Sequence, residues 1–445
     1  MAGLAGLSLP ELMRCKAATG GESGRAGKSV ILLWMAGGPS HIDTWEPTAD
    51  RPWVNRGPFG VTRTKLPGTF ICEHLPKQAA MLDKFTIIRS VDCRMSNHEP
   101  NRVMQTGHRQ AAPRTNPQGY TYPAIASVVA KHRGANHPAM PPSVAFMKSR
   151  SHIAFAGHLG QRYDPFIGND VADLPRLDLV GNVVGRNEVS GAFRLPVELN
   201  HQRLHDRRAV LRDLDRLRVG VDRSGSMDAM DAYGQQAMEL VLGGRARGAF
   251  DLSSEPPKWR DRYGEHLWCQ QALLARRLVE AGVSFVTLDL SYHTASGTWD
   301  THGDNIPPYG GIEKGLGPLL PIFDHLVTTL VADLEDRGLL AAVLVLALGE
   351  FGRTPNMGTQ DSTDGRNHWP VVMSMIAAGG GLNHGQVIGA TESDGGAIRA
   401  RPVSPGDLAA TIYRHMGVPL DATYEDPQGR PHFVVADGKP IAVLF

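Results

Sequence analysis

Residues 342–350 read AVLVLALGE, seven apolar residues that end in a glycine and a carboxylate. Their hydrophobicity is continuous rather than alternating, which predicts a strand covered on both faces, as in a parallel sheet flanked by helices. The same character is found in four further runs, at residues 30–35, 85–91, 284–290 and 371–377. Between them lie segments with helical periodicity or helix-capping signals, at residues 123–132, 261–281, 319–336 and 404–417. Strands that alternate with helices predict an α/β fold.

The composition is that of a large globular protein without a charge bias. Among 445 residues, 46 are Lys or Arg and 45 are Asp or Glu, so the formal net charge is +1. This balance provides no general attraction to nucleic acid or to an anionic membrane. Hydrophobic residues make up 42%, enough for an extended core, and no apolar run reaches the length of about 20 residues that spans a membrane. The four cysteines form no C-x-x-C pair, which argues against a zinc knuckle and leaves one disulfide open.

Two segments differ from the α/β pattern. Residues 1–13 are apolar and carry no charge before Glu11. We interpret residues 1–26 either as the remnant of an export signal that lacks its basic start or as a short arm on the fold. Residues 195–245 combine charges of both signs with apolar residues at helical spacing, which predicts a helical insertion with a solvated face.

Acidic and imidazole side chains follow four of the predicted strands, at the point where each strand ends. In an open parallel sheet the carboxyl ends of the strands share one edge, where ligands bind. Asp, Glu and His supply the oxygen and nitrogen ligands of zinc, manganese and related ions. Four such strand ends therefore predict one metal site at this edge, with a hydrogen-bonded structural network as the alternative. The residues concerned are His41 and Asp43; Ser96, Asn97, His98, Thr106 and His108; His293, Asp300, His302 and Asp304; and Glu350, Arg353 and His368.

Two of these residues have a competing structural interpretation. Glu350 stands at the end of a buried strand, where an unpaired charge is unfavourable. It could ligate a metal or form a salt bridge with Arg353. His368 precedes Trp369 and could ligate a metal or pack on the tryptophan as a core imidazole.

Five motifs, GGPSHIDTWEP, NHEP with TGH, WDTHGDN, GEFGRTP and GRNHWP, occur in an order that resembles the DUF1501 family. That family is abundant in planctomycetes and is assigned to the alkaline phosphatase-like superfamily, which includes sulfatases. The resemblance extends from about Gly27 to Leu444. It implies a single three-layer α/β/α domain over residues 27–445, with a mainly parallel central sheet and the helical insertion at about residues 195–245.

The resemblance also implies a set of metal ligands. WDTHGDN is similar to an Asp/His ligand element, and GEFGRTP stands where sulfatases have a D-H-G turn, so that Glu350 would replace the Asp. GRNHWP is similar to the segment that carries the last ligand. The implied metal is zinc, with manganese or calcium as alternatives. The ligands that we predict to share one cavity are His41, Asp43, Asp300, His302, Glu350 and His368.

The segment that resembles the nucleophile region of sulfatases departs from their pattern. Thr106 and Gly107 match the family's T-G, but Asn97 and His98 stand near the nucleophile position, and the nearest hydroxyl is that of Ser96. We predict that the catalytic residues are His98, Asn97 and Arg353.

The function implied is an exported, metal-dependent hydrolase of phosphate or sulfate esters carried by a small molecule or a polysaccharide. In this hypothesis the charge of Arg353 stabilises the charge that develops on the ester. The alternative is a catalytically inactive binding or assembly protein that retains the fold. Family members often begin with a twin-arginine export signal, which implies a periplasmic location, with the cytoplasm as the alternative.

Overall fold

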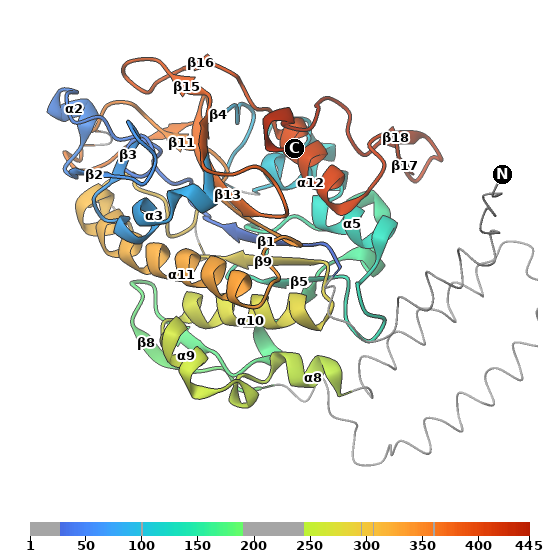
Figure 1. Cartoon of the computed structure of the whole chain (residues 1–445). Helices are drawn as coiled ribbons and strands as arrows, with labels where there is room; N and C mark the ends of the chain where they lie inside the picture. The colour runs from blue at the N-terminus through green and yellow to red at the C-terminus, as the bar shows by residue number, and fades with distance from the viewer. Residues whose placement is uncertain (1–26, 99–100, 190–243, 295, 306, 359–360) are drawn as a thin grey trace, which may run out of the picture.

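The computed structural model describes residues 27–445 except 99–100, 190–243, 295, 306 and 359–360 (Figure 1). The segment 1–26, interpreted above as an arm or a signal remnant, lies outside the described residues. So does nearly all of the helical insertion predicted at residues 195–245.

An eight-stranded sheet forms the centre of the molecule. Its strands are β1 (Ser29–Trp34), β4 (Phe85–Val91), β5 (Ser143–Phe146), β6 (Phe166–Ile167), β9 (Phe285–Asp289), β10 (Val343–Leu348), β13 (Met373–Gly379) and β14 (Gln386–Ile388). Their order is β14-β4-β13-β10-β1-β9-β5-β6. All five predicted apolar runs are strands of this sheet, so the α/β class is confirmed.

The sheet is mainly parallel, with one exception. β13 is antiparallel to both of its neighbours, β10 and β4, whereas all other pairs in the sheet are parallel. The described part of the connection from β10 to β13 contains the ribbon of β11 (Gly352–Arg353) and β12 (His368–Trp369) in place of a crossover helix. The beginning of β13 therefore lies at the edge where the parallel strands end, and this brings His368 to that edge.

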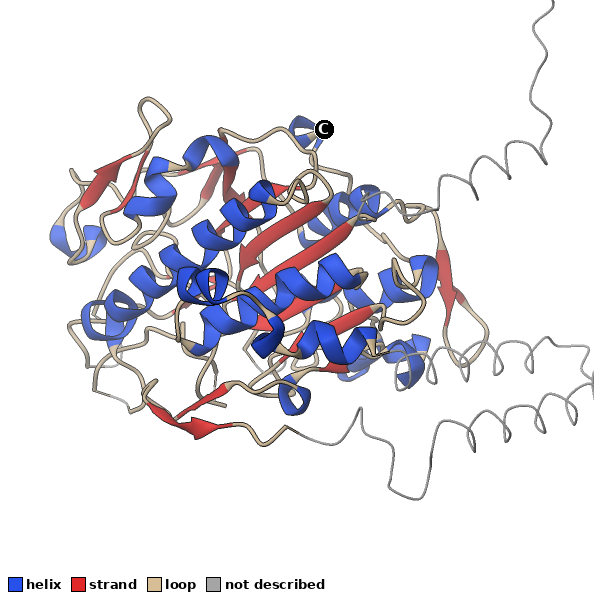
Figure 2. Cartoon of the chain, turned by 60° about the horizontal axis from the view of Figure 1, so that its bottom comes forward, coloured by secondary structure: helices blue, strands red, loops and turns tan. Residues whose placement is uncertain are grey.

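Helices cover both faces of the sheet, which explains why the strands are apolar throughout. Ile31 and Leu33 of β1 belong to an apolar cluster with α10 (Leu267–Ala281) and α11 (Gly317–Asp336). Leu32 and Trp34 face the other way, into a cluster with α5 (Ile125–Arg133) and α12 (Pro405–Met416). Figures 1 and 2 show these helix layers on either side of the strands. The three-layer α/β/α arrangement is confirmed.

The predicted helix ends are confirmed at α12 and corrected at α10. Ser404 forms a capping box with Asp407, and Gly417 ends the helix in the left-handed conformation. The segment predicted as one helix over residues 261–281 is instead two, α9 (Pro257–Tyr263) and α10. Gly264 has a φ of 87° and ends α9, and the side chain of His266 caps the beginning of α10.

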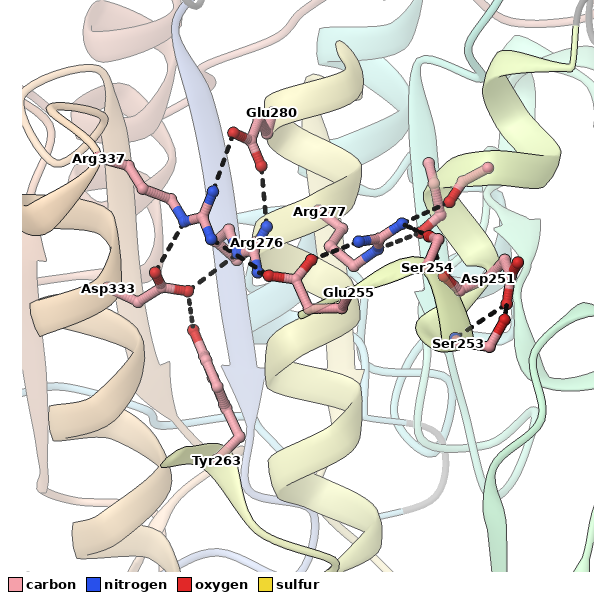
Figure 3. A network of polar contacts seen from close by, with 12 residues as sticks. Asp251, Ser253, Ser254, Glu255, Tyr263, Arg276, Arg277, Glu280, Asp333 and Arg337 are labelled. Carbon is pink, nitrogen blue, oxygen red and sulfur yellow. Dashed lines mark hydrogen bonds and ion pairs between the residues drawn. The ribbon is translucent and has the colours of Figure 1, made fainter. Parts of the chain in front are cut away.

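An ion-pair network joins α10 to α11 (Figure 3). Asp333 accepts hydrogen bonds from Arg276 Nε at 2.9 Å and from the Tyr263 hydroxyl at 2.9 Å. Arg276 also pairs with Glu255, which binds Arg277 as well. Because Asp333, Arg276 and Glu255 are all buried, their mutual pairing compensates charges that would otherwise be unfavourable in the core.

One helical stretch, Gly311–Asp336, is apolar and long enough to cross a membrane by length and composition alone. It includes α11, and 61% of its most apolar window is buried against the rest of the molecule. This is the behaviour of a core helix.

Shorter elements surround the central layers. They are α2 (Trp53–Arg56), α3 (Pro76–Ala80), α4 (Val103–Thr106), α8 (Arg245–Phe250), β2 (Val61–Arg63), β3 (Phe70–Cys72), β7 (Pro175–Leu177), β8 (Val183–Arg186), β15 (Ala390–Thr391), β16 (Ile398–Ala400), β17 (Thr423–Glu425) and β18 (Pro431–Phe433).

Candidate metal centre

Four side chains that could hold a metal ion meet at the carboxyl edge of the sheet. His98, Asp300, His302 and His368 each offer one ligand atom, and these atoms lie within 4.8 Å of one another. His98 follows β4, Asp300 and His302 follow β9, and His368 begins β12. The group is thus assembled from three separate strand ends, as the sequence pattern predicts for a site at this edge.

His98 stands at the centre of the group and directs its two ring nitrogens to different partners. Its Nε2 lies 2.6 Å from His368 Nε2 and 3.2 Å from Asp300 Oδ2. Its Nδ1 lies 2.6 Å from Glu350 Oε1. Burial alone would lower the pKa of His98, but its hydrogen bonds with Asp300 and Glu350 outweigh burial and raise the pKa. In this geometry Nε2 faces the other ligands, and Nδ1 is held by a carboxylate.

Asp300 is kept ionised by its surroundings. Its Oδ1 contacts Arg353 Nη2 at 2.6 Å and also His302 Nδ1. Burial would raise the pKa of Asp300, but the charge of Arg353 and the bonds from His302 and His98 hold it well below its usual range. The carboxylate is therefore available as an anionic ligand.

His368 is held in its neutral form. Burial, followed by the charge of Arg353, lowers the pKa of His368 to about 2. A neutral imidazole keeps a nitrogen lone pair, which is the form that binds metals. Two Nε2 atoms at 2.6 Å require a proton between them, since two lone pairs repel.

Glu350 lies beside the four-residue group rather than within it. Its Oε1 accepts hydrogen bonds from His98 Nδ1 and from the Gly37 amide at 2.9 Å. Arg353 pairs with Asp300, so the salt bridge considered for Glu350 and Arg353 is replaced by two separate pairs. A carboxylate that binds the far nitrogen of a ligating histidine orients the ring and increases its basicity. Glu350, predicted as a ligand, thus contacts the group through His98 and is not one of its four members.

His41 and Asp43, which were also predicted as ligands, lie outside the group of four. Asp43 is paired with Arg366, whose Nε lies 2.7 Å from Asp43 Oδ2, and it also accepts a hydrogen bond from Ser40. His41 Nε2 lies 2.8 Å from the carbonyl oxygen of Gly395. Both side chains are buried, and these contacts direct them toward protein partners instead of toward the four-residue group.

The predicted catalytic residues other than His98 have different surroundings. Arg353 is fully buried and, besides Asp300, donates to the carbonyl oxygens of Gly37, Gly38 and Arg366. Its contacts are thus with the Asp300 carboxylate and with backbone carbonyl oxygens. Asn97 precedes His98 in the loop after β4 and is half-buried.

Two hydroxyl groups beside the metal group were not predicted from the sequence. Ser296 donates to Asp300 Oδ2, and its Oγ lies 2.8 Å from the hydroxyl of Tyr309. The signal for Ser296 is its position four residues before Asp300 in the same loop. Serine is too common in loops for that spacing to single it out.

The residues present fit a divalent cation. Three imidazoles and one carboxylate form the nitrogen and oxygen donor set that suits zinc, and related divalent metals accept the same donors. The donor set specifies no single metal.

Solved structures with a similar fold include hydrolases. The PsFucS1 sulfatase from Pseudoalteromonas sp. is 13% identical, and the match covers 92% of this chain and 70% of that one, with a TM-score of 0.39. Ps i-CgsB in complex with k-i-k-neocarrahexaose is 11% identical over 88% of this chain and 72% of that one, with a TM-score of 0.41. The phosphonate monoester hydrolase SpPMH from Silicibacter pomeroyi is 12% identical over 94% and 76%, with a TM-score of 0.35. Likeness at this level supports no conclusion about function.

No curated protein matches the sequence. A family model described as "Protein of unknown function (DUF1501)" matches residues 27–445. That match spans the whole of the described range, in agreement with the five motifs, and the chain therefore belongs to the DUF1501 family.

Proposed function

We propose that this chain is a metal-dependent hydrolase of phosphate or sulfate esters, with one divalent cation held by His98, Asp300, His302 and His368. The observation that carries the proposal is the convergence of four ligand atoms within 4.8 Å. A cation bound there would polarise an ester oxygen and lower the pKa of a coordinated water or hydroxyl. Zinc is the first choice, because imidazole nitrogen and carboxylate oxygen are its usual donors.

The surrounding residues have positioning roles in this proposal. Glu350 holds His98 Nδ1, so that Nε2 points to the other ligands. Arg353 fixes the Asp300 carboxylate through Oδ1 and leaves Oδ2 directed at His98. His302 and His368 are the less buried members, so an ester would approach from their side.

A binding or assembly protein that retains the fold is the second candidate. It is favoured by the burial of Arg353, which leaves the predicted set without a cation that faces the ester. In this case the metal would stabilise the fold instead of reacting.

Metal analysis followed by an esterase panel tests the proposal. The purified protein is loaded with zinc, manganese or calcium and assayed on aryl phosphate, phosphodiester and sulfate esters before and after chelation. We expect one equivalent of tightly bound metal and turnover that chelator abolishes. His368→Ala should remove both, whereas the matched control His384→Ala should keep both, since His384 contacts the Gly379 carbonyl and lies outside the group. Inertness across the panel would favour the binding protein, and the absence of bound metal would contradict the metal-dependent hydrolase.

A further inference from the structure

The hydroxyl of Ser296 occupies a special position beside the candidate metal centre. It donates to Asp300 Oδ2, the same oxygen that lies 3.2 Å from His98 Nε2. A cation shared by Asp300 and His98 would therefore have the Ser296 oxygen as an immediate neighbour. Ser296 is buried, and its hydrogen bonds with Asp300 and Tyr309 hold the side chain in place.

The directions of the hydrogen bonds around Ser296 leave one lone pair of its oxygen without a donor in the described part of the chain. The Ser296 hydroxyl donates to Asp300 Oδ2, so its proton is directed at that oxygen. The hydroxyl of Tyr309, 2.8 Å away, must then donate to the Ser296 oxygen. A hydroxyl oxygen has two lone pairs, and the second has no partner among the described residues.

We infer that Ser296 is the nucleophile of the proposed hydrolase, and this inference rests on the proposed function above. It provides the nucleophile that is missing from the segment around Asn97 and His98, which resembles the nucleophile region of sulfatases. Thr106 is an unsuitable candidate, since its hydroxyl donates to the Val103 carbonyl and accepts from the His108 amide at the end of α4. Ser96 is buried, and its hydroxyl contacts none of the four ligands among the described residues.

The reaction balances with water as the only co-reactant. The Ser296 oxygen forms a bond to the phosphorus or sulfur of the ester, and the bond to the alcohol oxygen breaks. The serine proton leaves by way of Asp300 Oδ2, to which it is already donated, and solvent water supplies a proton to the departing alcohol. Water then cleaves the serine ester, releases phosphate or sulfate and restores the hydroxyl.

A pair of cysteine variants tests the placement of the hydroxyl without relying on turnover. Ser296→Cys and the matched control Ser96→Cys are each loaded with cobalt, and their absorption spectra are compared with that of the cobalt-loaded wild type. A thiolate that binds cobalt produces an intense charge-transfer band, because sulfur is a strong ligand of such metals. We expect the band in Ser296→Cys and not in Ser96→Cys. The band in Ser96→Cys alone, or in neither variant, would overturn the inference.

Activity and trapping measurements test the chemical role. Ser296→Ala should keep its bound metal and lose turnover by roughly 10³-fold or more, as is usual for a missing nucleophile. Tyr309→Phe should retain part of the rate. Acid quenching during turnover of the wild type, followed by peptide mass analysis, should place the covalent ester on residue 296.

The outcomes separate this inference from the proposed function. Wild-type turnover that survives in Ser296→Ala, or an ester on another residue, overturns the role of Ser296 and leaves the hydrolase standing. A wild type that binds metal, shows the band in Ser296→Cys and turns over no ester overturns the hydrolase, and the nucleophile with it.

Discussion

Replacement of Glu350 by Gln isolates the contribution of its charge to the metal centre. In the wild type, Glu350 Oε1 lies 2.6 Å from His98 Nδ1 and 2.9 Å from the Gly37 amide nitrogen. Glutamine has the same size and keeps one oxygen that can accept both hydrogen bonds. The change removes the negative charge that makes His98 a better ligand. Loss of such an outer partner of a ligating histidine lowers metal affinity by roughly 10- to 100-fold, or about 1.4–2.8 kcal/mol.

The stability of the metal-free protein should change much less. Because the glutamine oxygen still accepts both hydrogen bonds, we expect the free energy of unfolding in chelator to fall by no more than about 1 kcal/mol. In excess metal, the free energies of unfolding of the wild type and the variant should differ more. The increase equals the binding free energy that the variant has lost, since a ligand stabilises only the state that binds it.

Competition titration against a chromogenic zinc chelator measures the affinity, and melting curves with and without chelator measure the stability. Glu46→Gln is the matched control, because Glu46 is a second buried glutamate that is bonded to Thr391 and lies outside the metal group. His98→Ala provides the scale for removal of a direct ligand. An affinity within threefold of the wild type would refute the orienting role of Glu350, and a loss as large as that of His98→Ala would show that it ligates the metal directly.

Three further predictions concern the core and the loop that holds the centre. Asp333→Ala should destabilise the fold by about 3–5 kcal/mol in urea unfolding, because it breaks the buried ion pair with Arg276 and leaves the Tyr263 hydroxyl without its acceptor. Glu280→Ala should cost about 1 kcal/mol or less in the same assay, since that side chain is 43% exposed. Burial would raise the pKa of Glu255, but its ion pairs with arginines lower the pKa overall. The ionised Glu255 therefore contributes to the free energy of unfolding above the ordinary carboxyl pKa, and this contribution is lost as the pH falls through the lowered pKa. Unfolding measured across the acid range should show this loss in the wild type and a flatter profile in Glu255→Gln. Gly37→Ala should weaken zinc binding in the chelator titration, because Gly37 has a φ of 117° and a Cβ there would lie 2.3 Å from the Asp300 amide; unchanged affinity would contradict this account.

The sequence by itself determined the elements of the fold and the edge that carries the chemistry. Five continuous apolar runs are strands of the central sheet, because burial on both faces selects apolar residues at every position. The two ends of α12 could also be predicted, because Ser404, Asp407 and Gly417 cap the helix through contacts with residues close to them in the chain. His98, Asp300, His302 and His368 were all predicted at strand ends, and they are the four residues that meet.

Only the tertiary structure decided how these side chains pair. Asp43 and Arg366 are 323 residues apart and form a buried ion pair, and Asp43 lies outside the group of four. Glu350 and Arg353 are neighbours in sequence, yet one binds His98 and the other Asp300. The antiparallel direction of β13 places His368 at the same edge. Local propensity and periodicity follow from contacts within one segment, whereas the partner of a buried charge depends on which segments fold against it, and that is a property of the whole chain.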